Sequence, residues 1–68
     1  MKISYKPLWK LMIDKEIKQK DLKNGARLSS STIQKLRNNE NVTTDVLLRI
    51  CNFLDCDLSD IAECIKEN

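Results

Sequence analysis

The amino-acid sequence predicts an all-α protein built from five short helices. Apolar residues recur at spacings of three and four, which is the helical period, and the β-branched residues never alternate with polar ones over a strand's length. A single glycine and a single proline leave little material for hairpin turns. With 68 residues, of which 41% are hydrophobic and 32% charged, the chain is typical of one soluble globular domain spanning residues 1–68.

The composition also excludes several classes of protein. No apolar run approaches the roughly 18 residues of a membrane span, and lysines interrupt the N-terminal stretch that a signal peptide would keep apolar. We therefore expect a cytoplasmic protein without a membrane partner. Histidine is absent, and there is neither a glycine-rich phosphate loop nor a cysteine with a candidate base, so an enzyme is not expected.

Three cysteines, Cys51, Cys56 and Cys64, form no C-x-x-C pair and have no histidine to complete a zinc site. Their odd number also argues against a disulfide framework. We expect buried free thiols in a reducing cytoplasm. We expect no metal, no cofactor and no evident small-molecule ligand.

The first helix is expected over about Tyr5–Lys15. Ser4 is a candidate N-cap, and Pro7 falls in the first turn, where its missing N–H does little harm. The apolar side of this helix consists of Tyr5, Leu8, Trp9 and Met12, with Ile13 at its margin. The aromatic rings could stack on the bases of a single strand, but their spacing favours a place in the core.

Two short helices joined by a tight turn are expected next, over Gln19–Ala26 and Ser30–Arg37. Ser29 is a candidate N-cap of the second helix, and mostly polar residues follow it. The core-facing residues of the pair are Leu22, Ala26, Leu28, Ile33 and Leu36. A helix whose outer face carries small hydroxyls, an amide and a lysine can lie in the major groove of DNA.

The stretch QKDLKNGARLSSSTIQKL resembles the helix-turn-helix of Cro and phage repressors, the XRE-like family of bacterial and phage regulators. The similarity covers about residues 5 to 65 and implies a five-helix lambda-repressor-like DNA-binding domain. Family members usually have a glycine in the turn, where this chain has Arg27. Gly25 lies two residues earlier, so either Arg27 adopts a positive φ or the helix ends early at Gly25 and the turn is rebuilt.

The resemblance also implies which residues touch double-stranded DNA. The recognition helix is about Ser30–Arg37, and the base-contacting positions are occupied by Ser29, Ser30, Ser31 and Lys35. Lysine can donate to guanine, whereas short serine hydroxyls are permissive and carry little sequence information. Phosphate contacts are expected from Lys18, Gln19, Lys20, Gln34 and Asn38. The serine run also has a plainer interpretation, as a loop with a helix cap.

Charge is distributed unevenly along the chain, although the net charge is only +2. Residues 1–37 hold ten Lys or Arg against three acids, whereas residues 38–68 hold two basic residues against seven acids. One basic end and one acidic end indicate a side that faces a polyanion and a side that faces away. Glu40 and Asp45 stand where relatives often carry basic residues, and we expect them to weaken backbone contact there.

The C-terminal half is expected to form two more helices. Thr43 is the candidate N-cap of the fourth helix, and Asp55 is expected to end it at a positive φ. The apolar stripe of this helix is Val46, Leu47, Ile50, Cys51 and Leu54. The fifth helix opens with Asp57 as cap and Asp60 three residues later, close to a capping box. Its apolar residues are Leu58, Ile61, Ala62 and Ile65.

The sequence therefore predicts a transcriptional regulator that recognises a specific double-stranded DNA sequence. The alternative is a protein-interaction module of the same fold, antitoxin-like or adaptor, whose basic face meets an acidic protein. One recognition helix covers only a few base pairs, so a homodimer is expected. Its contact residues are expected to be Phe53, Leu58 and Ile65, unless Phe53 folds back to complete the core. No ligand-sensing or oligomerisation domain is expected within this chain.

Overall fold

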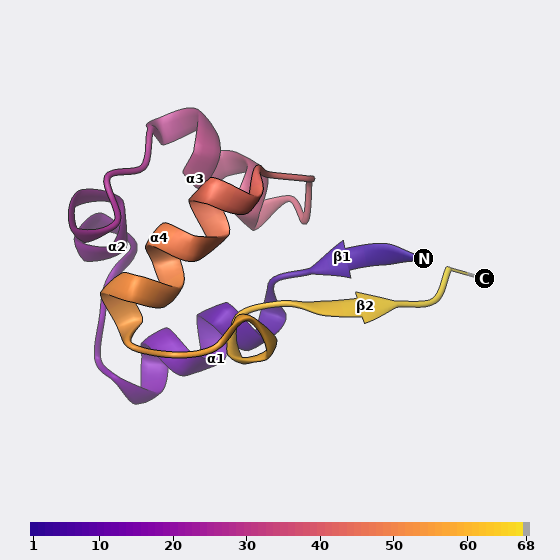
Figure 1. The fold of residues 1–68 in the computed structure, drawn as a ribbon, viewed down its shortest axis with the longest axis horizontal. Coiled ribbons are helices and arrows are strands. Elements are labelled where there is room, and N and C mark those ends of the chain that lie inside the picture. The colour runs from indigo at the N-terminus through magenta and orange to yellow at the C-terminus, as the bar shows by residue number, and fades with distance from the viewer. Residues whose placement is uncertain (68) are drawn as a thin grey trace.

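Four α-helices, a short 3₁₀ helix and a two-stranded sheet make up the fold of residues 1–67. The structure, a computed structural model, describes residues 1–67. In chain order the elements are β1 (Lys2–Ser4), α1 (Lys6–Asp14), α2 (Gln19–Gly25), α3 (Ser30–Arg37), α4 (Thr44–Leu54), the 3₁₀ helix η1 (Leu58–Asp60) and β2 (Glu63–Ile65). Figure 1 shows α4 crossing the middle of the molecule and the two strands side by side at the edge where both termini lie. Four of the five predicted helices are present in residues 1–67, and the fold is mostly helical with a small sheet instead of entirely helical as expected.

The expected fifth helix does not form. Asp57 and Asp60 do make the expected reciprocal cap, because the N–H of Asp57 donates to Asp60 Oδ2 at 2.9 Å and the N–H of Leu58 donates to Asp57 Oδ1 at 2.7 Å. However, η1 ends after three residues. A single helical turn has little stability of its own, and Glu63–Ile65 instead pairs with the N-terminal strand.

The sheet joins the N-terminal and C-terminal segments. Strands β1 and β2 run antiparallel, with Lys2 opposite Ile65, Ile3 opposite Cys64 and Ser4 opposite Glu63. Strands of three residues are too short to show an alternating pattern, so neither is predictable from its own residues. Because Ser4 ends a strand, the N-cap of α1 is Tyr5, one residue later than expected. The Ser4 hydroxyl still accepts a hydrogen bond from the N–H of Lys6 at 3.3 Å.

The core collects apolar side chains from all four helices, from the residue before α1, from the turn between α2 and α3, and from the residue after η1. Its members are Tyr5, Leu8, Met12, Leu22, Ala26, Leu28, Ile33, Leu36, Val46, Ile50, Leu54 and Ile61. Two residues of the predicted α4 stripe, Leu47 and Cys51, are only half-buried, because α4 turns that side toward the surface. Trp9 packs against the core while half-buried, in agreement with the interpretation of its ring as a packing group.

Most helix starts lie where they are predicted. Helix α3 has the expected bounds, and the hydroxyl of its N-cap, Ser29, accepts from the N–H of Thr32 at 3.2 Å. Thr43 caps α4 in the same way, accepting from the N–H of Val46 at 3.3 Å. Asp55 ends α4 with a φ of 52°. Caps act within three residues of a helix end, so short sequence signals suffice to predict them.

The end of α2 is shaped by a close approach to α4. A Cβ atom added to Gly25 would overlap the aromatic ring of Phe53, so only glycine allows this contact. Phe53 folds back over α2 in this way and stays 36% exposed. The turn combines the two expected alternatives, because α2 ends at Gly25 and Arg27 adopts a φ of 58°.

Candidate nucleic-acid interface

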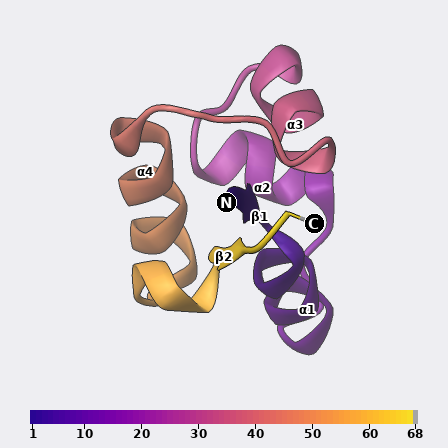
Figure 2. The same ribbon diagram turned by 90° about the vertical axis from the view of Figure 1, so that its right-hand side faces the viewer.

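The outer face of α3 carries polar side chains. Its exposed residues are Ser30, Ser31, Gln34, Lys35 and Arg37. Ile33 and Leu36 are buried and fix the helix on the core. Figure 2 shows α3 at the edge of the molecule with α2 next to it, and the two helices are in contact. Helix α3 therefore presents hydroxyl, amide and cationic groups to solvent, while its buried residues hold it on the core.

Hydroxyl groups order the N-terminus of α3. Ser29 Oγ lies 3.0 Å from Ser31 Oγ and 2.9 Å from Thr32 Oγ1, in addition to accepting from the N–H of Thr32. A serine hydroxyl has one hydrogen and two lone pairs, so these three partners occupy the bonding capacity of Ser29. Ser29 thus serves as a cap, while Ser30 and Ser31 are exposed with bonding capacity left.

The N-terminus of α2 gathers three of the residues for which phosphate contact is predicted. Lys18 is the N-cap, and Gln19 and Lys20 open the helix; all three are exposed. Asp21 Oδ2 accepts from the backbone N–H of Lys18 at 3.2 Å, which orders the first turn. Two ammonium groups and an amide therefore stand together at the N-terminus of α2.

A hollow of about 220 Å³ lies between α2 and α3. It is lined by Gln19, Lys20, Lys23, Ser30, Ile33 and Arg37. Lys23 Nζ donates to Ser30 Oγ at 2.7 Å, which joins the two helices by their side chains. No acidic side chain of residues 1–67 lines this α2–α3 hollow. Three cations and two hydrogen-bonding groups thus converge on one small space.

Arg49 of α4 braces the turn between α2 and α3. Its Nη1 donates to the carbonyl oxygen of Arg27 at 2.7 Å, and its Nε lies 3.1 Å from Asp45 Oδ2. The positive φ of Arg27 costs a non-glycine residue about 1–2 kcal/mol, so a fixed partner for its carbonyl group helps to hold the turn. The charge of Asp45 is paired with that of Arg49 within α4, which reduces the negative field around this carboxylate.

The loop after α3 ties the interface to the N-terminal segment. Asn39 has a φ of 56°, and its Oδ1 accepts from the N–H of Tyr5 at 3.0 Å. The Tyr5 hydroxyl donates to the carbonyl oxygen of Glu40 at 2.7 Å. Burial raises the pKa of Tyr5 above its usual 10.0, and this outweighs a lowering by the Val42 backbone. Asn38 Nδ2 donates to Glu40 Oε2 at 3.3 Å, so this predicted phosphate contact has an acidic neighbour.

Comparison with known proteins identifies this arrangement. Residues 7–67 match the family described as the Cro/C1-type HTH DNA-binding domain. The chain belongs to the Cro/C1-type helix-turn-helix family. Its structure is similar to the crystal structure of transcriptional regulator VanUg, Form II, with 47% sequence identity and a TM-score of 0.94 over 97% of this chain and 88% of that one. A search of curated proteins found no match.

The family resemblance inferred from the sequence is therefore confirmed, and α2, the turn and α3 are the helix-turn-helix of a Cro/C1-type DNA-binding domain. In the described part of the chain, four helices and a small sheet replace the five helices that the resemblance implied. No helix within residues 1–67 is long and apolar enough to cross a membrane.

Cysteine side chains in the described part of this Cro/C1-type domain are free thiols. Cys51 and Cys56 are half-buried and Cys64 is exposed, so the expectation of buried thiols is wrong for Cys64. Burial raises the pKa of Cys56 to about 11, which keeps this thiol protonated at neutral pH. Between residues 1 and 67, no three His, Cys, Asp or Glu side chains gather as a metal site requires.

Three residues of the candidate interface are not predicted from the sequence: Lys23, Arg37 and Arg49. Lys23 lies four residues after Gln19, and Arg37 lies seven after Ser30, so helical spacing places each on the face of a residue already singled out. This helical spacing could have pointed to both residues, but it does not show that the two helix faces pack against each other. Arg49 has no local signal, because the carbonyl group that it binds lies 22 residues away.

Proposed function

We propose that the chain is a sequence-specific transcriptional regulator that places α3 in the major groove of double-stranded DNA. The observation that carries the proposal is the exposure of Ser30, Ser31 and Lys35 on a helix anchored by Ile33 and Leu36. The major groove, roughly 12 Å wide, admits an α-helix with its polar face turned to the base edges. The role is that of a cytoplasmic binding protein and includes no enzymatic step.

Base reading is proposed to depend most on Lys35, since lysine donates to O6 and N7 of guanine. Ser30 and Ser31 are proposed to contact bases through their hydroxyls, and Ser29 contributes less because its hydroxyl is engaged in the cap. The proposed phosphate contacts are Lys18, Gln19, Lys20, Gln34 and Asn38. Such contacts set the register of the protein on the duplex without reading its sequence.

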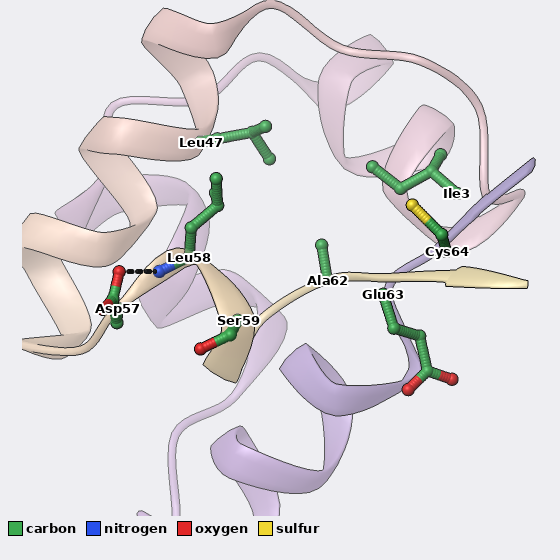
Figure 3. Close-up of a pocket in the computed structure, with 8 residues that line it drawn as sticks. All are labelled: Ile3, Leu47, Asp57, Leu58, Ser59, Ala62, Glu63 and Cys64. Atoms are coloured by element: carbon green, nitrogen blue, oxygen red, sulfur yellow. Dashed lines mark hydrogen bonds between the residues drawn. The ribbon is translucent and has the colours of Figure 1, made fainter.

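We also propose that the regulator acts as a homodimer, because one α3 helix is too short to single out a site in a genome. A groove of about 580 Å³ offers a contact surface, lined by Ile3, Leu47, Asp57, Leu58, Ser59, Ala62, Glu63 and Cys64 (Figure 3). None of these residues belongs to α2 or α3, so a second copy seated there leaves the DNA-binding face free. Leu48 is 60% exposed next to Leu47 in α4, and it gives each copy an apolar side chain for the other's groove.

The three residues predicted for the dimer contact differ in how well they suit it. Leu58 lines the groove and is 44% exposed. Phe53 covers Gly25 with its ring, so part of its surface is already used. Ile65 is half-buried and is not among the residues that line the groove. We therefore propose a contact centred on Leu58, with Phe53 and Ile65 at its margins.

Salt titration of binding to a random-sequence duplex tests the DNA-binding function. Counterion release predicts that log K falls linearly with log salt, by about 0.9 for each phosphate contact. Several contacts should therefore give a slope of several units. A chain that binds no duplex even at low salt contradicts the regulator proposal and favours the protein-interaction module.

Sequence reading is tested by comparing Lys35→Ala with Lys20→Ala on sequences selected from a random pool. Lys35→Ala should weaken specific binding by about 1–3 kcal/mol and relax the preference at one base pair. Lys20→Ala should weaken binding to all sequences alike and lower the salt slope by about one unit. Identical effects would mean that Lys35 contacts only phosphate.

The homodimer is tested by sedimentation at increasing protein concentration, with and without duplex. Leu58→Asp should abolish the association, since it places a charge in the proposed contact. The matched control is Ile13→Asp on α1, where the native side chain is already 75% exposed, and it should leave the association unchanged. A native chain that stays monomeric at millimolar concentration, alone and on duplex, contradicts the proposal.

A further inference from the structure

Two basic residues of the α2–α3 hollow, Lys23 and Arg37, have no role in the contacts proposed above. Lys23 is half-buried and Arg37 is exposed. No acidic side chain within residues 1–67 lies within salt-bridge distance of either one. Neither positive charge is paired with a carboxylate of these residues, so both are available to an anionic ligand.

The hollow is formed by one face of each helix. Gln19, Lys20 and Lys23 lie within about one turn of α2, and Ser30 and Arg37 are two turns apart on α3. The hydrogen bond from Lys23 Nζ to Ser30 Oγ, 2.7 Å long, holds the ammonium group at the hollow before any ligand arrives. An ammonium group has three donors, so Lys23 keeps two for a ligand. This preorganisation lowers the entropy lost on binding.

The size of the hollow limits what it can hold. Its volume of about 220 Å³ is below the roughly 300–1,000 Å³ of sites that enclose a drug-sized ligand. A single phosphate group fits this space, whereas a whole nucleotide does not. The guanidinium of Arg37 can bond two phosphate oxygens at once, and the ammonium of Lys23 adds a compact charge.

The place of the hollow favours a phosphate of the DNA backbone. In helix-turn-helix proteins the second helix enters the major groove and the first crosses the backbone, so the backbone passes where the two helices meet. We propose that the α2–α3 hollow seats one backbone phosphate, held jointly by Lys23 and Arg37. This inference rests on the proposed DNA-binding function and adds to it two binding residues that share one phosphate. Lys23 also links that phosphate to Ser30, through the bond between their side chains.

The experiment measures log K for a random-sequence duplex between 50 and 200 mM KCl. The variants are Lys23→Gln, Arg37→Gln and the double variant. Each is compared only if it melts at the same temperature as the native chain, so that a loss of binding cannot come from unfolding. The double variant should lower the salt slope by about 0.9, the value for one phosphate. Over this fourfold salt range, that difference in slope changes K by about 3.5-fold. Each single variant should lower the slope by less, because the other cation of the pair still neutralises the shared phosphate. Lys20 also lines the hollow, but it is proposed to contact a separate phosphate and so does not replace the pair in the double variant.

Two controls separate charge from packing. Lys10→Gln removes an exposed cation of α1, outside the helix-turn-helix, and should leave the slope unchanged. Lys23→Arg keeps the charge at the hollow and should keep the native slope. A double variant that lowers the slope by about 1.8, or not at all while the native chain binds duplex with a steep slope, overturns the shared phosphate.

Inorganic phosphate distinguishes a backbone phosphate from a free one. Added phosphate should shift the backbone amide resonances of Ser30 and Lys23 in the native chain, and the shift should disappear in the double variant. If these shifts occur while the double variant binds duplex like the native chain, the hollow is a free-anion site and the proposal is overturned. If the native chain binds no duplex at any salt, the proposed function itself fails.

Discussion

The helix-turn-helix and the two-stranded sheet are held in place by different means. Between Gln19 and Arg37, all five core residues are at most 6% exposed, and a serine caps α3. In the sheet, Ile3 and Ile65 are only half-buried, and Cys64 is exposed. The strands also come from opposite ends of the chain. Their pairing therefore closes a long loop, which costs chain entropy.

The well-buried helix-turn-helix and the less buried sheet therefore lie in different parts of a small fold. Helix α3 is anchored on the core by Ile33 and Leu36, and Arg49 of α4 holds the turn that precedes it. The sheet and η1 are less buried, and the apolar groove lies there. The surface left uncovered at that end is the one proposed for a second copy of the chain, and it lies away from the proposed DNA interface.

The contrast should be largest when a core side chain is truncated in each region. Leu22 is fully buried, so Leu22→Ala should lower the free energy of unfolding by about 2–5 kcal/mol. A core of this size rarely supplies more than about 3–5 kcal/mol, so this variant should be largely unfolded at 37 °C. The sheet variant Ile3→Ala should cost clearly less in urea denaturation. Equal losses would show that the sheet is as firmly integrated as the helix-turn-helix.

A methyl group at Gly25 tests the packing that holds the helix-turn-helix against α4. Gly25→Ala should destabilise the fold by about 1–3 kcal/mol, because the added atom overlaps the Phe53 ring. In an unobstructed helix the same change would stabilise by up to about 1 kcal/mol. Thermal melting of Gly25→Ala and of Gly25→Ala with Phe53→Ala, each against its glycine parent, separates the two effects. A higher melting temperature for Gly25→Ala alone would contradict the close contact.

Tyr5 connects the two regions, and pH tests that connection. Its phenol binds the carbonyl group of Glu40 in the neutral form, and burial raises its folded-state pKa above 10.0. The folded state therefore keeps this proton longer than the unfolded state does, and the stabilisation present below pH 10 should fall as the pH rises above it. Tyr5→Phe should cost about 0.5–1.5 kcal/mol at pH 7.

The measurement for Tyr5 is urea denaturation at several pH values between 7 and 11. The native chain should lose stability above pH 10, and Tyr5→Phe should lose less over the same range. Parallel losses in the two proteins would mean that another group causes the alkaline effect.

The smallest expected effect is at Arg27, in the turn of the helix-turn-helix. Arg27→Gly should stabilise the fold by about 0.5–1 kcal/mol, because glycine adopts the φ of 58° without strain but loses more backbone entropy. Arg27→Ala removes the same side chain and retains the strain, so it should show no gain. The melting temperatures of the two variants show whether relief of backbone strain at position 27 stabilises the fold. An equal rise in both would assign the effect to charge and not to the backbone.

Most of the correct predictions of helix ends rest on residues within one turn of the helix end. The starts of α3 and α4 follow from Ser29 and Thr43, and the end of α4 at Asp55 follows from the tolerance of aspartate for a positive φ. The reciprocal cap of Asp57 and Asp60 was also predictable, but the helix that should have followed it was not formed. Contacts of the individual DNA-binding residues remain predictions, since they depend on a duplex.

The sequence by itself determined the four helices, the helix-turn-helix and the family, because helical periodicity and caps act over a few neighbouring residues. Tertiary structure alone decided that Glu63–Ile65 pairs with Lys2–Ser4, that Phe53 packs on Gly25 and that Lys23 and Arg37 share a hollow. These contacts join residues that are distant in the chain, and such pairs leave no repeating pattern along it. Their geometry depends on how the helices pack, and only the assembled core sets that.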